Sequence, residues 1–293
     1  MINVNSEIGR LKMVLVHRPD DGISRVSPRR AEELLFDDIV YLPQMQEEHD
    51  IFTELLKALI GEENVLETEQ LLFESLEVDD KAKHTMIDLI IDYEELPSFT
   101  RARLLSFSNA ELAELLITGY DKAEDHILFD PIPNFIFTRD IAVAVNDHVI
   151  ITKAAKEARF RENILTRFIF SNHPMFAQLR AEDKLINLNH IDEFPPSKKG
   201  ETVSIEGGDM MMISDKHLLV GLSHRTNIEA IECLITHTFE KNQLDKISVI
   251  KIPDKRDYMH IDTVFTQVKK DMWVLFGPFS KMGYERPHRT NAS

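Results

Sequence analysis

The sequence is poor in cysteine, in basic residues and in long apolar runs. Its single cysteine, Cys233, cannot form an internal disulfide and fits a reducing cytoplasm. No apolar run approaches the roughly 20 residues of a membrane-spanning helix, and residues 1–7 lack the basic start and apolar stretch of a secretory signal. The 34 Lys and Arg against 50 Asp and Glu leave a net charge of -16, which repels phosphate backbones. We therefore expect a cytoplasmic protein that binds neither nucleic acid nor a membrane.

Strand-like and helix-like patterns alternate in the first 61 residues. Residues 11–16 form an apolar run typical of a buried strand, and Ser27 with Pro28 is typical of a helix start. A stronger helix is predicted over residues 44–60, and Gly61 would end it. Its apolar residues fall at helical spacing: Phe52, Leu55, Leu56 and Leu59. This alternation, with 43% hydrophobic residues to build a core, indicates an α/β fold.

Residues 67–122 differ from the sequence on either side. They contain no glycine before Gly119 and many Leu and Glu, and Ser108 with Glu111 forms a capping box that predicts a helix start. We interpret this stretch as a helical insertion in an α/β domain made of residues 1–66 and 123–293. The alternative is that these helices belong to the main layers of the domain.

Three later segments share one pattern, in which a polar cluster precedes apolar strands. The clusters lie at residues 134–140, 204–209 and 260–265. Helices are predicted from about residue 156 and at Thr226. The acidic clusters are about 66 and about 55 residues apart, which suits a blade of the order strand, strand, helix, strand. Blades arranged radially would bring the polar clusters to one axis.

Four residues of these clusters could act together: Asp140, Glu206, His260 and Asp262. His260 and Asp262 are two residues apart on an expected strand, so both side chains would face the same way. The two glycines after Glu206 would allow a close approach. Carboxylates that face a common point repel each other unless a cation lies between them, and a planar guanidinium group fits two of them. A further carboxylate and a histidine could move protons, so the set predicts chemistry at a guanidinium carbon.

The same segments resemble arginine deiminases, which belong to the guanidine-modifying superfamily. The resemblance rests on residues 3–11 and 17–19, on Leu35-Phe36-Asp37-Asp38 and on the three polar clusters, in order along nearly the whole chain. It implies a five-bladed, pseudo-symmetric α/β propeller of ββαβ blades around a central site. It also implies hydrolysis of L-arginine to L-citrulline and ammonia, without a cofactor or a metal.

The resemblance assigns catalytic and guanidinium-binding roles to the four clustered residues. Asp140 and Asp262 would hold the guanidinium group of the substrate. Glu206 and His260 would act as the acid and base that move protons.

Further substrate contacts follow from the resemblance alone. Asn134 would contact the amino-acid end of the substrate, and Phe137 would pack along it. Arg159 and Arg225 would bind the α-carboxylate. For Arg225 the residues agree, because it precedes an expected helix start at Thr226, and a helix start favours an anion.

The sequence departs from the family in its cysteine content. The nucleophile of the family is a cysteine in the last blade, whose thiolate forms a covalent intermediate that water hydrolyses. No cysteine follows Cys233, so we expect the last blade to be missing, the ring to stay open and the chain to associate as a homo-oligomer. Cys233 lies four residues before His237, but on a helix expected to pack outside the site, and we interpret it as an inert, partly buried thiol.

Three alternatives remain open. The chain could be a non-catalytic protein that binds arginine through the retained carboxylates. It could be a metallohydrolase that uses Glu206, His260 and Asp262 with Asp140, although a single histidine is a thin ligand set for zinc. Within the superfamily it could also act on agmatine or dimethylarginine or transfer amidino groups, but Arg159 and Arg225 argue against agmatine, which has no carboxylate.

Overall fold

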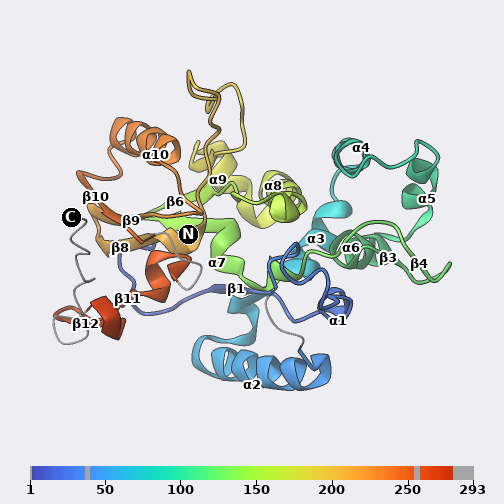
Figure 1. The fold of residues 1–293 in the computed structure, drawn as a ribbon, viewed down its shortest axis with the longest axis horizontal. Helices are drawn as coiled ribbons and strands as arrows, with labels where there is room; N and C mark the ends of the chain where they lie inside the picture. The colour runs from blue at the N-terminus through green and yellow to red at the C-terminus, as the bar shows by residue number, and fades with distance from the viewer. Residues whose placement is uncertain (1, 37–39, 254–257, 280–293) are drawn as a thin grey trace, which may run out of the picture.

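The computed structural model describes residues 2–36, 40–253 and 258–279 and confirms an α/β fold of helices and short sheets (Figure 1). Asp37 and Asp38 of the family motif, and the sequence from residue 280 onward, lie outside the described residues. Among the described residues, no helix combines the length and the apolar character needed to cross a membrane.

The N-terminal segment contains one parallel strand pair joined through a long helix. Strand β1 (Val14–Val16) pairs with β2 (Val65–Glu67), and α2 (Leu42–Ile60) connects them. The predicted strand at 11–16 is therefore confirmed over its last three residues. The predicted helix at Ser27 is wrong: a short helix, α1 (Asp21–Ser24), precedes a run of turns. Those turns end at Leu35, whose positive φ of 59° is incompatible with a continuing helix.

Helix α2 covers the predicted residues 44–60 and begins two residues earlier, but its apolar stripe is largely exposed. It ends at Gly61, whose φ is 93° and whose backbone N–H is bonded to the carbonyl of Lys57. Leu56 is buried, whereas the neighbouring Phe52, Leu55 and Leu59 are 52, 57 and 67% exposed. In Figure 1 the helix lies at the margin of the molecule. The apolar periodicity therefore marks a helix whose apolar stripe is largely open to solvent.

The helices predicted within residues 67–122 are present. They are α3 (Thr68–Leu76), α4 (Asp80–Tyr93), α5 (Thr100–Ser106) and α6 (Asn109–Thr118). The capping box of Ser108 and Glu111 is confirmed at the start of α6. The apolar cluster of these helices continues into α8 (Phe160–Asn172), which belongs to the following repeat. The division of the chain into an insertion and a surrounding domain stays a prediction.

Two successive ββαβ units follow, after the short hairpin of β3 (Tyr120–Asp121) and β4 (His126–Ile127). The first unit contains β5 (Ala142–Val145), β6 (His148–Ile151), α8 and β7 (Leu185–Asn187), with α9 (Ala177–Ala181) before β7. The second contains β8 (Met210–Ser214), β9 (His217–Leu222), α10 (Ile228–Glu240) and β10 (Lys246–Lys251). In each unit the first two strands are antiparallel and the third joins the second in parallel. A third unit begins with the hairpin of β11 (Phe265–Lys269) and β12 (Met272–Leu275).

A short helical turn precedes the first strand of each unit and carries its polar cluster. These turns are η2 (Pro133–Ile136) with α7 (Thr138–Ile141), then η5 (Gly207–Asp209), then η7 (Ile261–Thr263). Glu206 and His260 occupy the same position, directly before η5 and η7. The prediction that His260 and Asp262 lie on a strand is wrong. Because the chain coils at η7, His260 is buried and Asp262 is exposed.

Candidate active site

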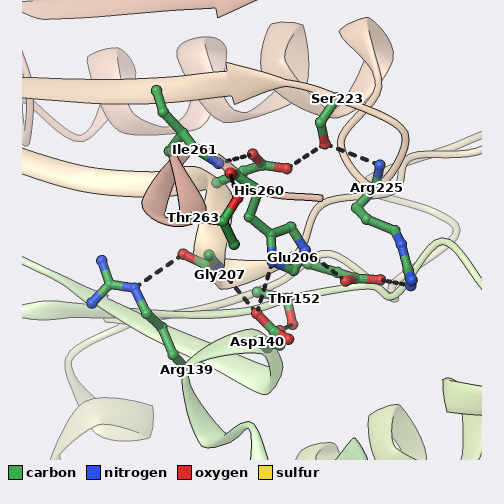
Figure 2. Close-up of polar contacts among 12 residues, drawn as sticks. Arg139, Asp140, Thr152, Glu206, Gly207, Ser223, Arg225, His260, Ile261 and Thr263 are labelled. Carbon is green, nitrogen blue, oxygen red and sulfur yellow. Dashed lines mark hydrogen bonds and ion pairs between the residues drawn. The ribbon is translucent and has the colours of Figure 1, made fainter. Parts of the chain in front are cut away.

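The three units bring one ionisable group each to a single buried cluster (Figure 2). Asp140, Glu206 and His260 are only 9, 0 and 5% exposed. One ligand atom of each lies within 4.8 Å of the others. Residues 66 and 54 positions apart are thus joined by the repeat of the fold rather than by sequence proximity.

Glu206 and His260 form the central pair of the cluster. The Nε2 atom of His260 lies 2.9 Å from Oε2 of Glu206, and its Nδ1 atom lies 3.8 Å from Oδ1 of Asp140. Burial would raise the pKa of Glu206, but the hydrogen bond with His260 and the charges of two arginines outweigh it and lower that pKa to about 2. Burial would lower the pKa of His260, yet its bond to Glu206 and the charge of Asp140 raise it. Each group therefore favours the charged form of the other, a carboxylate on Glu206 and an imidazolium on His260.

The guanidinium group of Arg159 lies against three carboxylates. Its Nη1 atom is 2.9 Å from Oδ2 of Asp140 and 3.2 Å from Oε2 of Glu206. Its Nε and Nη2 atoms lie 2.9 and 2.8 Å from Oε2 of Glu162. Burial raises the pKa of Glu162 to about 7 against the pull of Arg159. Glu162 is a site residue that the sequence reasoning missed, although its position three residues after Arg159 on one helical face could have indicated it.

Arg225 approaches Glu206 from the corresponding loop of the next unit. Its Nη1 atom lies 3.3 Å from Oε1 of Glu206, and the residue is buried. Arg159 and Arg225 both follow the second strand of their unit, β6 and β9. The helix expected to start at Thr226 begins at Ile228 instead, because the hydroxyl group of Thr226 bonds to Asp209 and Asn227 caps α10. The first two units thus each supply a carboxylate before the first strand and an arginine after the second.

Three predicted site residues remain: Asn134, Phe137 and Asp262. Among the described residues, their side chains form no hydrogen bond to Asp140, Glu206 or His260. Asn134 is buried, and its side-chain amide donates to the carbonyl of Leu34, while its backbone carbonyl accepts from Arg159 at 3.3 Å. Phe137 is half exposed at the end of η2. Asp262 is exposed on η7. Phe137 and Asp262 are therefore accessible from solvent, whereas the Asn134 side chain is engaged elsewhere.

The two glycines after Glu206 are required by close packing. A Cβ atom at Gly207 would lie 1.8 Å from the carbonyl oxygen of Arg139. One at Gly208 would lie 2.5 Å from Nδ1 of His260. The backbone N–H of Gly208 also donates to Oδ1 of Asp140 at 3.1 Å. Residues without side chains thus allow the turn of Glu206 to contact both other members of the cluster.

The cluster has the spacing of a metal site, but its carboxylates already have cationic partners. Asp140, Glu206 and His260 could offer three ligand atoms. Both carboxylates already face the guanidinium group of Arg159, and Glu206 also faces that of Arg225. A divalent ion would have to lie beside two arginines, which repel it. The metallohydrolase alternative is therefore disfavoured by the groups that surround the cluster.

Comparison with known proteins gives the family. The model of the family described as arginine deiminase matches residues 32–124 and 117–286. The chain belongs to the arginine deiminase family. An arginine deiminase of Bacillus cereus (strain B4264) is 37% identical over 94% of this chain and 68% of its own length. One of Listeria monocytogenes serotype 4b is 33% identical over 91% of this chain and 67% of its own length.

Solved structures of other enzymes also align with most of the chain. A dimethylarginine dimethylaminohydrolase adduct has 15% identity and a TM-score of 0.48, covering 91% of this chain and 69% of its own. A mutant of that enzyme from Pseudomonas aeruginosa, complexed with citrulline, has 15% identity and a TM-score of 0.46, covering 88% and 66%. Membership of the arginine deiminase family makes this chain one of a family of hydrolases that act on guanidino C–N bonds.

Cys233 lies on α10 and packs at the border of an apolar cluster. Burial raises the pKa of its thiol, and the charges of Glu232 and Glu229 raise it further. His237, four residues on, packs its ring against Phe194 with 4.6 Å between the ring centroids. These surroundings are those of an unreactive thiol, in agreement with the interpretation from the sequence.

Proposed function

We propose that this chain binds L-arginine with its guanidinium group between Asp140 and Glu206, as part of the hydrolysis of arginine to citrulline and ammonia. The observation that carries the proposal is the position of Arg159, because a guanidinium group already lies between these two carboxylates. The protein therefore has a buried place whose charge and shape suit that group. A free arginine would have to displace Arg159 from it, because Arg159 already bonds to both carboxylates and all three residues are buried.

The displaced Arg159 would then meet the other end of the substrate. Together with Arg225 it would bind the α-carboxylate, and Glu206 and His260 would move protons during the reaction. Asp262 would add a third carboxylate to the guanidinium group, and Phe137 would pack along the aliphatic part. Asn134 would contact the amino-acid end after releasing the carbonyl of Leu34. The chain would need no cofactor.

Substituting Arg159 by alanine should separate its two proposed roles. Agmatine carries a guanidinium group but no carboxylate, so loss of the competing Arg159 should leave its affinity unchanged or increase it. Arginine should lose the contact with its carboxylate, and its affinity relative to agmatine should fall about tenfold, the usual value of a charge-assisted hydrogen bond. Titration calorimetry with both ligands measures the ratio. Arg180→Ala is a matched control, because Arg180 lies on α9 and its guanidinium group donates to the backbone carbonyls of Phe170 and His173.

An unchanged ratio would contradict the carboxylate role of Arg159. Loss of all binding of both ligands would contradict its displacement, provided that thermal unfolding shows a folded variant. Asp140→Asn offers a second test, because it removes a carboxylate from the guanidinium place and should weaken both ligands together.

We further propose that Cys233 is not the nucleophile of the reaction. Its thiol lies on α10 with a raised pKa, whereas an attacking thiol needs a lowered one. We therefore expect no formation of citrulline from arginine by this chain alone, in a colorimetric assay compared with a no-protein control. Activity that disappears in Cys233→Ser would show that Cys233 does act. Binding without turnover would support the second candidate function, a non-catalytic arginine-binding protein.

The five-bladed ring, the cytoplasmic location and self-association remain proposals. The apolar residues of α2, with those of β12, are exposed and could pair with a second copy of the chain: Ile51, Phe52, Leu55, Leu59, Met272 and Val274. We expect light scattering to detect an oligomer in roughly 0.5 M salt, where charge repulsion is screened. Leu55→Glu and Leu59→Glu should shift it toward the monomer, and a monomeric wild type would contradict the proposal.

A further inference from the structure

Asp209 is a buried carboxylate that the proposed reaction does not use. It is the last residue of η5, three positions after Glu206, and is 0% exposed. Its Oδ2 atom accepts hydrogen bonds from the hydroxyl groups of Ser223 at 2.5 Å and Thr226 at 2.6 Å. Its Oδ1 atom accepts one from the backbone N–H of Ile261 at 2.9 Å. All three donors lie on loops that carry residues of the site.

The first two donors hold the loop of Arg225. Ser223 and Thr226 flank Arg225, and the hydroxyl oxygen of Ser223 also accepts from the backbone N–H groups of Arg225 at 3.0 Å and Thr226 at 3.2 Å. The hydroxyl oxygen of Thr226 further accepts from the backbone N–H of Glu206 at 3.4 Å. A single carboxylate therefore fixes the loop of Arg225 relative to Glu206, the carboxylate that Arg225 contacts.

The third donor holds His260. Ile261 directly follows His260 at the start of η7. Its hydrogen bond to Asp209 therefore fixes the backbone next to the histidine (Figure 2). The chain leaves room for this arrangement at Gly221 of β9, where a Cβ atom would lie 2.3 Å from Oδ1 of Asp209. Gly208 likewise has no side chain where a Cβ atom would meet the ring of His260. The approach of η5 to both neighbouring segments thus depends on residues without side chains.

We propose that Asp209 is a positioning residue for arginine binding, which joins the Arg225 loop, the turn of Glu206 and the backbone after His260 into one unit. The inference rests on the proposed function, because it assigns Asp209 to the geometry of that binding site. A buried carboxylate is costly unless each oxygen is bonded. Burial raises the pKa of Asp209 to about 6, although His260 and its three donors oppose the rise. The three hydrogen bonds that offset the cost of burying Asp209 are the same bonds that orient the neighbouring loops.

Two variants separate the effect of the hydrogen bonds of Asp209 from the electrostatic effect of its charge. Asp209→Asn removes the charge and replaces one of the two accepting oxygens by an NH2 group, which cannot accept a hydrogen bond from a hydroxyl group. The double variant Ser223→Ala, Thr226→Val keeps the charge but removes the bonds that hold the Arg225 loop. We expect both to weaken arginine binding about tenfold in calorimetry, the effect of a lost buried hydrogen bond. We also expect both to lower the pKa of His260, measured by NMR in the absence of arginine. In the double variant the cause is a looser contact with Glu206, and in Asp209→Asn the lost charge of Asp209 lowers the pKa as well.

A control and two outcomes complete the test. Thr68→Val removes a comparable buried hydroxyl bond, to the carbonyl of Val16 at 2.9 Å, and should change stability without changing arginine affinity or the pKa of His260. If the double variant matches the wild type in both measurements, Asp209 acts only through its charge and the positioning role is refuted. If the wild type itself binds no arginine, the proposed function fails, whereas the NMR measurement still decides whether Asp209 positions His260.

Discussion

Glu206→Gln should lower the free energy of unfolding by roughly 3–5 kcal/mol at neutral pH, the usual cost of removing one partner from a buried ion pair. The carboxylate is fully buried, and its oxygens lie 2.9 Å from His260, 3.2 Å from Arg159 and 3.3 Å from Arg225. The amide keeps the shape of the side chain but removes the charge that His260 and both arginines face. Urea unfolding of both proteins at pH 7 measures the difference.

The effect of Glu206→Gln should also depend on pH. The folded-state pKa of Glu206, about 2, lies below the ordinary value of 4.5. The stabilisation is therefore present above about pH 4.5 and is lost as the pH falls toward 2. Glu193→Gln is the matched control, since Glu193 is exposed and its contact with His190 spans 3.4 Å, so it should change stability by less than about 1 kcal/mol. Equal stability of Glu206→Gln and wild type at pH 7 would refute the charge arrangement of the cluster.

The repeated units could be predicted from the sequence, because each repeats the same order of polar cluster, apolar strands and helix. Parallel pairing of β7 with β6 and of β10 with β9 completes each unit, and the polar clusters of the three units meet in the structure. The prediction failed where the chain forms turns of three residues. Such a turn has no periodicity, so nothing in the sequence of η7 shows that His260 is buried while Asp262 is exposed.

The ion pairs of Arg159 also could not be predicted from the sequence. Its partners Asp140 and Glu206 lie 19 and 47 residues away, and the pairing depends on how two units pack. Apolar periodicity likewise identified α2 as a helix but could not indicate whether another element covers its apolar stripe. Local patterns therefore predict elements and their order. Ion pairs between units and the burial of a helix face follow only from the packing.

A second large effect is expected from His17, at the end of β1. The residue is 1% exposed, and both ring nitrogens are bonded: Nδ1 lies 2.9 Å from Oε1 of Glu67 and Nε2 lies 2.9 Å from Oδ2 of Asp20. Each carboxylate also caps a helix, since Asp20 accepts from the backbone of α1 and Glu67 from that of α3. Burial opposes the charged form, but the hydrogen bonds to Asp20 and Glu67 raise the pKa of His17 to about 10. One buried imidazolium thus connects β1, α1 and α3.

His17→Asn should therefore destabilise the fold by roughly 3–5 kcal/mol at pH 6, because it leaves two carboxylates near each other without their shared cation. The sign of the pH dependence is opposite to that of Glu206. The folded pKa of about 10 exceeds the ordinary value of 6.5, so the stabilisation is complete below about pH 6.5 and is lost as the pH rises toward 10. Urea unfolding from pH 6 to 10 should show the difference between wild type and variant shrinking steadily. His190→Asn, at an exposed histidine, should show no such trend, and a difference for His17→Asn that stays constant up to pH 10 would mean that His17 is neutral in the folded protein.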